Sequence, residues 1–86
     1  MQLWEIEGAV RDFVVTNFLF GQPLDLRPGE SLLDRGIIDS TGVLEIIAFL
    51  EERYSIKVED LEVNPANLGS IASISAFVGR KLERAA

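Results

Sequence analysis

Apolar residues recur at steps of three and four along three separate stretches of the chain, and this spacing predicts three amphipathic helices. In the first stretch, most of the apolar residues fall on one stripe; these residues are Leu3, Ile6, Val10, Phe13, Val14 and Phe18. The second runs from about Ser40 to Tyr54, with an inner stripe of Val43, Ile46, Ile47, Leu50 and Tyr54. The third covers about residues 71–83, with an inner stripe of Ile71, Ile74, Phe77, Val78 and Leu82.

The connections between these stretches differ in length and in chemistry. Residues 19–38 contain glycines and prolines without a sustained period, which predicts a long loop. We expect four leucines to anchor this loop to the core, and a serine to start a short turn in it: Leu24, Leu26, Leu32 and Leu33, with Ser31. After the second helix, Ile56 and Val58 alternate with polar residues, but this run is too short to predict a strand.

Two helix starts are marked in the last third of the chain. Asn64 before Pro65 is typical of an N-cap followed by proline at the first helical position, so a single short helical turn is expected at 64–68. Ser70 is expected to cap the last helix. The predicted fold is therefore all-α: a four-helix bundle with three longer helices, one short third helix and a long loop between the first and second helices, forming one domain over residues 1–86.

Three aromatic residues are predicted to contribute to the core of this bundle. Trp4 and Phe13 are expected in the core or at its rim, and Tyr54 is expected to close the base of the second helix. Thr41, Leu44 and Ala48 form a second row on the second helix and should lie at the edge of the buried face or outside it.

Composition then removes several classes of function. The chain has no cysteine and no histidine, so it lacks a disulfide framework, the usual zinc ligands and the commonest general base. We expect it not to be an enzyme and to hold no metal. Its net charge is −6, with 14 acidic and 8 basic residues, which argues against nucleic-acid binding. An acidic surface suits a basic protein partner, or it serves solubility alone. No stretch is long and apolar enough to cross a membrane, and no signal peptide is recognised, so a cytoplasmic monomer is expected.

The segment "GIIDSTGVLEII" contains the candidate chemistry. Asp39 and Ser40 stand where the second helix should begin, and an Asp-Ser pair is most often just a helix cap. If Asp39 is the cap, Ser40 is the first helical residue and its hydroxyl faces solvent. A phosphoryl group attached there would lie at the positive end of the helix dipole. Without a histidine in the chain, another enzyme would have to activate this serine.

At these residues the sequence resembles the acyl carrier protein superfamily. The resemblance rests on "LLDRGIIDSTGVLEIIAFLEERYSIKV" and "NLGSIASISAFV", and it covers nearly the whole chain. It implies that Ser40 carries a 4'-phosphopantetheine arm, derived from coenzyme A, whose thiol holds an acyl or aminoacyl group. It also implies that Asp39 lies beside the serine while a phosphopantetheinyl transferase, with magnesium, modifies it. The sulfur that the sequence lacks would then arrive on the arm.

Departures from the commonest pattern narrow the resemblance. Thr41 and Gly42 stand where fatty-acid carriers usually have leucine and an acidic residue. "GIIDS" also has one more residue between glycine and aspartate than the usual fatty-acid form. The chain looks more like stand-alone aminoacyl carriers, such as D-alanyl carrier proteins, and carriers of specialised pathways.

The resemblance also implies partners and a docking surface. Residues 34–62 hold eight acidic and three basic residues, or −5 of the net charge. In the family the second helix docks on basic patches of partner enzymes, and six residues are expected to do so here: Thr41, Leu44, Glu45, Ala48, Glu51 and Glu52. An adenylating ligase or an acyltransferase would load the carrier, and downstream acyl-using enzymes would unload it.

Three interpretations remain open from sequence. The first is an acyl or aminoacyl carrier modified at Ser40. The second is a small helical protein-interaction module without a prosthetic group, in which Asp39-Ser40 is only a cap. The third is a carrier-like domain that has lost its modification and has a structural role. Four residues, Ile46, Ile47, Leu50 and Val78, either line a channel for an acyl chain or form ordinary core.

Overall fold

A computed structural model of the chain describes residues 2–19 and 27–85, and all regular structure within these ranges is helical. The elements are α1 (Leu3–Phe18), α2 (Ser40–Tyr54), a 3-10 turn η1 (Asp60–Glu62), α3 (Pro65–Leu68) and α4 (Ile71–Ala85). The predicted all-α fold, with three longer helices and one short third helix, is confirmed. The η1 turn was not predicted.

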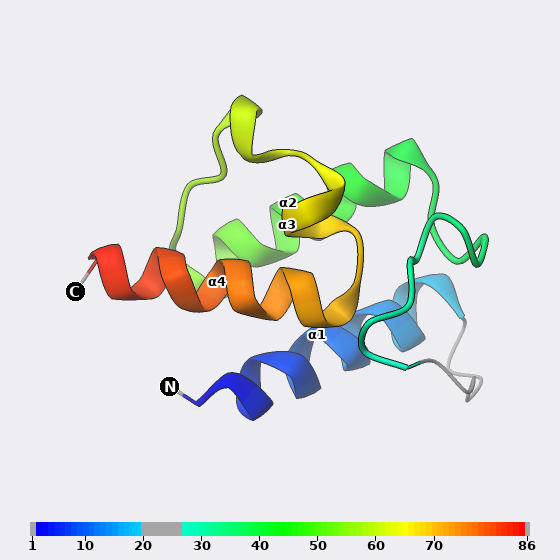
Figure 1. Cartoon of the computed structure of the whole chain (residues 1–86), viewed down its shortest axis with the longest axis horizontal. Coiled ribbons are helices and arrows are strands. Elements are labelled where there is room, and N and C mark those ends of the chain that lie inside the picture. The colour runs from blue at the N-terminus through cyan, green and yellow to red at the C-terminus, as the bar shows by residue number, and fades with distance from the viewer. Residues whose placement is uncertain (1, 20–26, 86) are drawn as a thin grey trace.

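The arrangement is built around α4, which packs against α1 and α3. Figure 1 shows that α1 and α4 run in opposite directions, so the first residues of α1 and the last residues of α4 lie toward the same end of the molecule. Helix α2 runs back toward that end, and the segment with η1 and α3 returns the chain to the start of α4. The beginning of α2 therefore lies at the opposite end from the described ends of the chain.

The core consists of the stripes expected from the apolar periodicity. Ile6, Val10 and Val14 of α1 are at most 1% exposed, and Ile46 and Leu50 of α2 are equally buried. Helix α4 contributes Ile71, Ile74, Phe77 and Val78. Tyr54 is buried at the base of α2, as predicted, and Ile56 and Val58 are buried without forming a strand.

Of the two aromatic residues of α1 that were predicted in the core or at its rim, one lies elsewhere. Trp4 is 73% exposed, so its assignment to the core was wrong. Ile6 and Val10 supply the buried stripe of α1, and Trp4, two positions before Ile6, falls outside it. Phe13 is half-buried and stacks on Phe49, with 4.2 Å between the ring centroids, which places it at the rim as expected.

The loop between α1 and α2 is described from Arg27 onward, so the predicted anchors Leu24 and Leu26 lie outside the described residues. Leu32 is fully buried, as predicted, whereas Leu33 is 47% exposed and is not an anchor. Adjacent residues in a turn point in different directions, and the turn at 31–36 directs only Leu32 inward. The hydroxyl of Ser31 accepts a hydrogen bond from the N–H of Asp34, which confirms the short turn.

Each predicted cap is present. The Oδ1 of Asn64 accepts from the N–H of Asn67 at 2.9 Å, with Pro65 at the first position of α3. The Oγ of Ser70 accepts from the N–H of Ser73 at 3.0 Å at the start of α4. These bonds satisfy backbone donors that a helix leaves unpaired at its first turn.

Helix α2 ends at Ser55, whose φ of 54° lies in the left-handed region. A side chain in this conformation costs roughly 1–2 kcal/mol, which glycine avoids. We predict that Ser55→Gly raises the free energy of unfolding by about 0.5–1 kcal/mol, since glycine's greater unfolded-state entropy cancels part of the gain. Ser55→Ala, which keeps the Cβ atom, should not stabilise. Chemical denaturation of both variants checks this, and equal effects of glycine and alanine would contradict it.

Candidate functional site

Ser40 is the first residue of α2, and both Asp39 and Ser40 are exposed. Gly36, with φ of 70°, turns the chain ahead of them. Ile38 is only 6% exposed and inserts into the core immediately before the pair. The local fold therefore fixes the chain at position 38 and leaves the next two side chains in solvent.

Asp39 is the N-cap that the sequence predicted. Its backbone is extended, and its Oδ1 accepts a hydrogen bond from the N–H of Gly42 at 2.8 Å. This bond satisfies one of the free N–H groups of the first turn and places a negative charge at the positive end of the helix dipole. The capping bond is made by Asp39, so the hydroxyl of Ser40 is not needed to start the helix.

Gly42 brings the first turn of α2 close to α1. A Cβ atom there would stand 3.0 Å from Cβ of Ile38 and 3.1 Å from the ring of Phe18. Such distances are tighter than ordinary van der Waals contact, so only glycine allows this approach without displacement. The departure from the fatty-acid pattern at this position thus has a packing reason: the end of α1 supports the start of α2.

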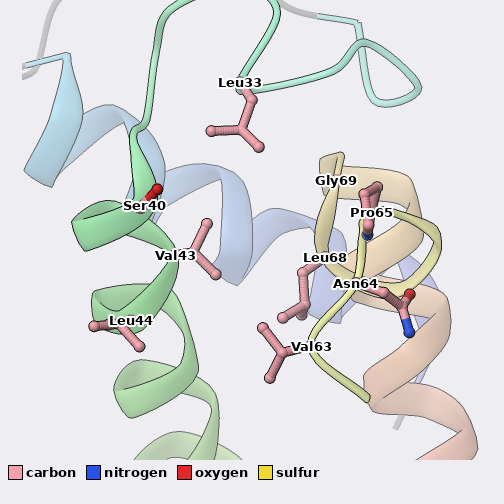
Figure 2. A pocket seen from close by; sticks show the side chains of 9 residues that line it. All are labelled: Leu33, Ser40, Val43, Leu44, Val63, Asn64, Pro65, Leu68 and Gly69. Carbon is pink, nitrogen blue, oxygen red and sulfur yellow. The ribbon is translucent and has the colours of Figure 1, made fainter. Parts of the chain in front are cut away.

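An apolar groove of about 280 Å³ opens beside the serine. Figure 2 shows Val43 and Leu44 of α2 on one side and Val63 and Leu68 on the other. The complete lining is Leu33, Ser40, Val43, Leu44, Val63, Asn64, Pro65, Leu68 and Gly69. Sequence analysis identified Ser40 and Leu44, but it missed Leu33 and Val63, because their place depends on loops that lack a periodic signal.

The groove wall opposite α2 belongs to a hydrogen-bonded frame. The N–H of Leu32 donates to the carbonyl of Gly69 at 2.9 Å, and the N–H of Ala72 donates to the carbonyl of Pro28 at 2.8 Å. These bonds connect the loop before α2 to the junction of α3 and α4. The loop and the α3 segment are therefore joined into one unit on the side of the groove opposite α2.

Side chains of α4 fix the other end of this frame. The Nζ of Lys81 lies 2.9 Å from Oε1 of Glu62, and an Nη of Arg80 donates to Oδ1 of Asn67 at 3.0 Å. The side chain of Asn67 also donates to the carbonyl of Glu62 at 2.9 Å. The hydrogen bond from Lys81, together with that from the backbone N–H of Glu59, lowers the pKa of the Glu62 carboxyl below its usual range.

The residues predicted to bind partners lie mostly on the exposed side of α2. Thr41, Leu44, Glu45, Ala48 and Glu52 are exposed, and Leu44 is 65% exposed. Glu51 is half-buried, and its Oε2 accepts a hydrogen bond from the N–H of Val58 at 2.9 Å. Glu51 thus also holds the segment after α2, a role that sequence analysis did not identify.

Ile46, Leu50 and Val78, three of the four residues considered for a channel, are at most 1% exposed and belong to the core cluster. Ile47 packs against that cluster from its edge. None of the four lines the groove beside Ser40. Within the described ranges, acidic side chains form no group of three suited to a metal ion, and no helix is long and apolar enough to span a membrane.

Comparisons with known proteins identify carrier proteins as relatives of this chain. No family model matches the chain. A probable acyl carrier protein, PigG of Serratia sp. (strain ATCC 39006), is 27% identical over 75 residues, which is 87% of this chain and 86% of PigG. The structure of apo KstB-PCP, a peptidyl carrier protein, is 38% identical, covers 90% of this chain and 86% of its own, and superposes with a TM-score of 0.72.

A second structural relative comes from a crystal structure described as that of an FAD-dependent dehydrogenase. The matching chain is 28% identical, with a TM-score of 0.71, and the match covers 80% of this chain and 97% of that one. Because the match covers a larger share of that chain than of this one, the matching chain is the shorter of the two.

The ion pair between Glu62 and Lys81 should make stability depend on pH. Because the folded protein lowers the pKa of Glu62, this contribution is present above the ordinary carboxyl value near 4.5 and is lost as pH falls through the lowered value. We predict that Glu62→Gln is less stable than wild type at pH 7 and that the difference shrinks below about pH 4.5. Thermal unfolding of both proteins between pH 7 and pH 3 measures this difference in stability.

Glu83→Gln is the control for net charge, because Glu83 is an exposed carboxylate on α4 without the pairing to Lys81 that defines Glu62. A stability difference between Glu62→Gln and wild type that stays constant down to pH 3 would contradict the assignment.

Proposed function

Because the chain belongs to the superfamily of acyl and peptidyl carrier proteins, we propose that Ser40 carries a covalent 4'-phosphopantetheine group and presents acyl or aminoacyl groups to partner enzymes. The protein is a carrier rather than an enzyme. The observation that supports Ser40 as the attachment point is its exposed hydroxyl at the first position of α2, on the lining of an apolar groove.

The residues present fit this group. Ser40 is accessible, and the start of α2 offers the positive end of a helix dipole to a phosphodiester. When bound, the group supplies a terminal thiol that holds the cargo as a thioester, a function for which the chain itself has no cysteine. Asp39 stays committed to the cap through Oδ1, so modification of Ser40 need not disturb the helix start.

Attachment requires a transferase and coenzyme A. The Ser40 hydroxyl oxygen forms a new bond to the phosphorus that bears pantetheine, the bond from that phosphorus to the nucleotide phosphate breaks, and adenosine 3',5'-bisphosphate leaves. The hydroxyl proton passes to a base of the transferase, since the chain has no histidine to accept it. We expect the second carboxylate oxygen of Asp39 to face the magnesium ion of that enzyme.

Partner enzymes would approach the exposed side of α2. Glu45 and Glu52 would steer basic surfaces, and Thr41, Leu44 and Ala48 would supply the contact near the serine. An adenylating ligase or an acyltransferase would load the arm. The relative found in an FAD-dependent dehydrogenase crystal structure favours one class of downstream partner, a flavin enzyme that oxidises the carried group.

Modification at Ser40 has a direct readout in intact mass. With coenzyme A, magnesium and a broad-specificity phosphopantetheinyl transferase, wild type should gain the mass of one phosphopantetheine, and Ser40→Ala should gain none. Ser55→Gly, which alters another exposed serine just after the far end of α2, should be modified as wild type is. If folded wild type stays unmodified, the carrier interpretation is wrong, and the interaction-module interpretation, in which Asp39-Ser40 is only a cap, is favoured instead.

Asp39 is expected to have two separable roles. Asparagine caps helices about as well as aspartate, whereas alanine loses about 1 kcal/mol. We therefore predict that Asp39→Ala lowers the free energy of unfolding by that amount, that Asp39→Asn does not, and that both slow the modification of Ser40. Denaturation and a mass time course test the two parts. If Asp39→Asn were modified at the wild-type rate, the predicted role of Asp39 in modification would be wrong and only its capping role would stand.

A further inference from the structure

We propose that the surface formed by α1 and α4 is a contact between two copies of this chain, which associate as a two-fold symmetric dimer. This surface, the α1–α4 face, surrounds a hollow of about 540 Å³ whose lining residues are Leu3, Ile6, Ala76, Gly79, Arg80, Leu82 and Glu83. The proposal does not depend on the modification of Ser40. It departs from the monomer that sequence analysis expected, because no pattern in the sequence shows that α1 and α4 lie side by side.

Apolar side chains at the α1–α4 face are left uncovered. Leu3 is 49% exposed and Trp4, the next residue, is 73% exposed, whereas Ile6 in the same turn of α1 is buried. Five of the seven residues that line the hollow have no polar side-chain atom. Gathered apolar side chains mark an interaction surface, and tryptophan is enriched among the residues that dominate protein–protein binding. The face therefore has the composition of a protein contact.

Gly79 lies within α4 without a packing reason inside the chain. Glycine weakens the interior of a helix relative to alanine. Among the described residues outside its own helical turns, a Cβ atom at Gly79 would meet no atom within 4 Å, so no neighbour requires glycine there. Together with Ala76, about one turn earlier, it keeps the α4 side of the hollow free of long side chains. Such a surface lets a helix of another molecule approach closely.

The charges of the two helices favour a second copy as the occupant. Helix α1 holds three acidic residues and one basic residue, for a net charge of −2, and these are Glu5, Glu7, Asp12 and Arg11. Helix α4 holds three basic residues and one acidic residue, for a net charge of +2, and these are Arg80, Lys81, Arg84 and Glu83. The charges of α1 and α4 cancel, so the rest of the chain carries the whole net charge of −6. Two copies can therefore meet at this face without the like-charge repulsion that opposes contact elsewhere.

The same charges select the symmetry axis. A two-fold rotation can stack two α1–α4 layers in two ways, with each helix on its own copy or with α1 of one chain on α4 of the other. The first arrangement puts −2 on −2 and +2 on +2, whereas the second puts −2 on +2 twice. A two-fold contact repeats each pairing, so the difference counts double. Charge therefore favours the second arrangement, whose axis runs along the helices.

This axis places both serines at the same end of the dimer. Rotation about an axis along the helices does not exchange the two ends of the molecule, and α2 begins at the end away from the described termini (Figure 1). No residue of α2 lines the hollow, so α2 does not contribute to this part of the contact. Two copies of Ser40 would therefore be presented on one side of the assembly.

Analytical ultracentrifugation of the full chain tests the dimer. Wild type should behave as a reversible monomer–dimer mixture with a dissociation constant of about 1 mM or tighter. Gly79→Gln puts a long neutral side chain into the hollow and should weaken the dimer by about tenfold or more. Gly29→Gln is the matched control, because Gly29 is an exposed glycine outside the face and a Cβ atom there also meets nothing within 4 Å. Circular dichroism would establish that both variants are folded.

A charge exchange tests the arrangement of the helices. Glu5→Lys with Glu7→Lys changes α1 from −2 to +2, and Arg80→Glu with Arg84→Glu changes α4 from +2 to −2. Neither double variant should dimerise alone, because helices of like charge would then face each other. Mixed in equal amounts, the two should form a heterodimer, because each α1 then faces an α4 of opposite charge. Circular dichroism of each double variant is again the control for folding.

The outcomes are separate from the proposed function, because intact mass reports the modification of Ser40 in a monomer and in a dimer alike. Wild type that stays monomeric up to about 1 mM would contradict the inference. Equal effects of Gly79→Gln and Gly29→Gln would show that the copies meet at another surface. Dimers of each double variant alone, with no preference for the heterodimer in the mixture, would contradict the pairing of α1 with α4.

Discussion

The position at which α2 begins is the constraint on which the site depends. Ile38 is held in the core, and the carboxylate of Asp39 accepts the N–H of Gly42 at 2.8 Å, so the helix cannot begin earlier or later without losing one of these contacts. Ser40 is exposed because it falls between a buried anchor and a buried glycine. The reactive hydroxyl needs no special environment of its own, since its accessibility follows from its neighbours.

The two walls of the groove are held by different forces. Backbone hydrogen bonds join the loop at Leu32 to Gly69, and the Glu62–Lys81 pair joins the η1 turn to α4. Helix α2 rests on the core through apolar packing, with Ile46 and Leu50 fully buried. Apolar packing is non-directional, whereas hydrogen bonds fix geometry. The frame therefore fixes the groove wall opposite α2, whereas α2 itself is held by its buried side chains.

Sequence predicted the elements whose signals are periodic or local. The bounds of α2, the caps at Asp39, Asn64 and Ser70, and the buried stripes follow from helical spacing and cap chemistry, and the structure confirms them. The assignment of Trp4 to the core was wrong because Trp4 lies two positions before Ile6, outside the buried stripe of α1.

The groove could not be predicted, because it depends on segments that are distant in sequence. Leu33 faces Ser40 only because the turn at 31–36 sends Leu32 inward, and Val63 reaches the same place through the η1 turn. Neither segment has a periodic pattern, and the pairing of Glu62 with Lys81 spans 19 residues. The serine was identifiable from its motif, but its surroundings required the tertiary structure.

Charge and apolar area would contribute differently to partner binding on this surface. Exposed glutamates such as Glu45 and Glu52 act over a distance of about one Debye length, roughly 8 Å at physiological salt, and mainly raise the association rate. Exposed apolar side chains such as Leu44 act only on contact, where burial of apolar area stabilises a complex.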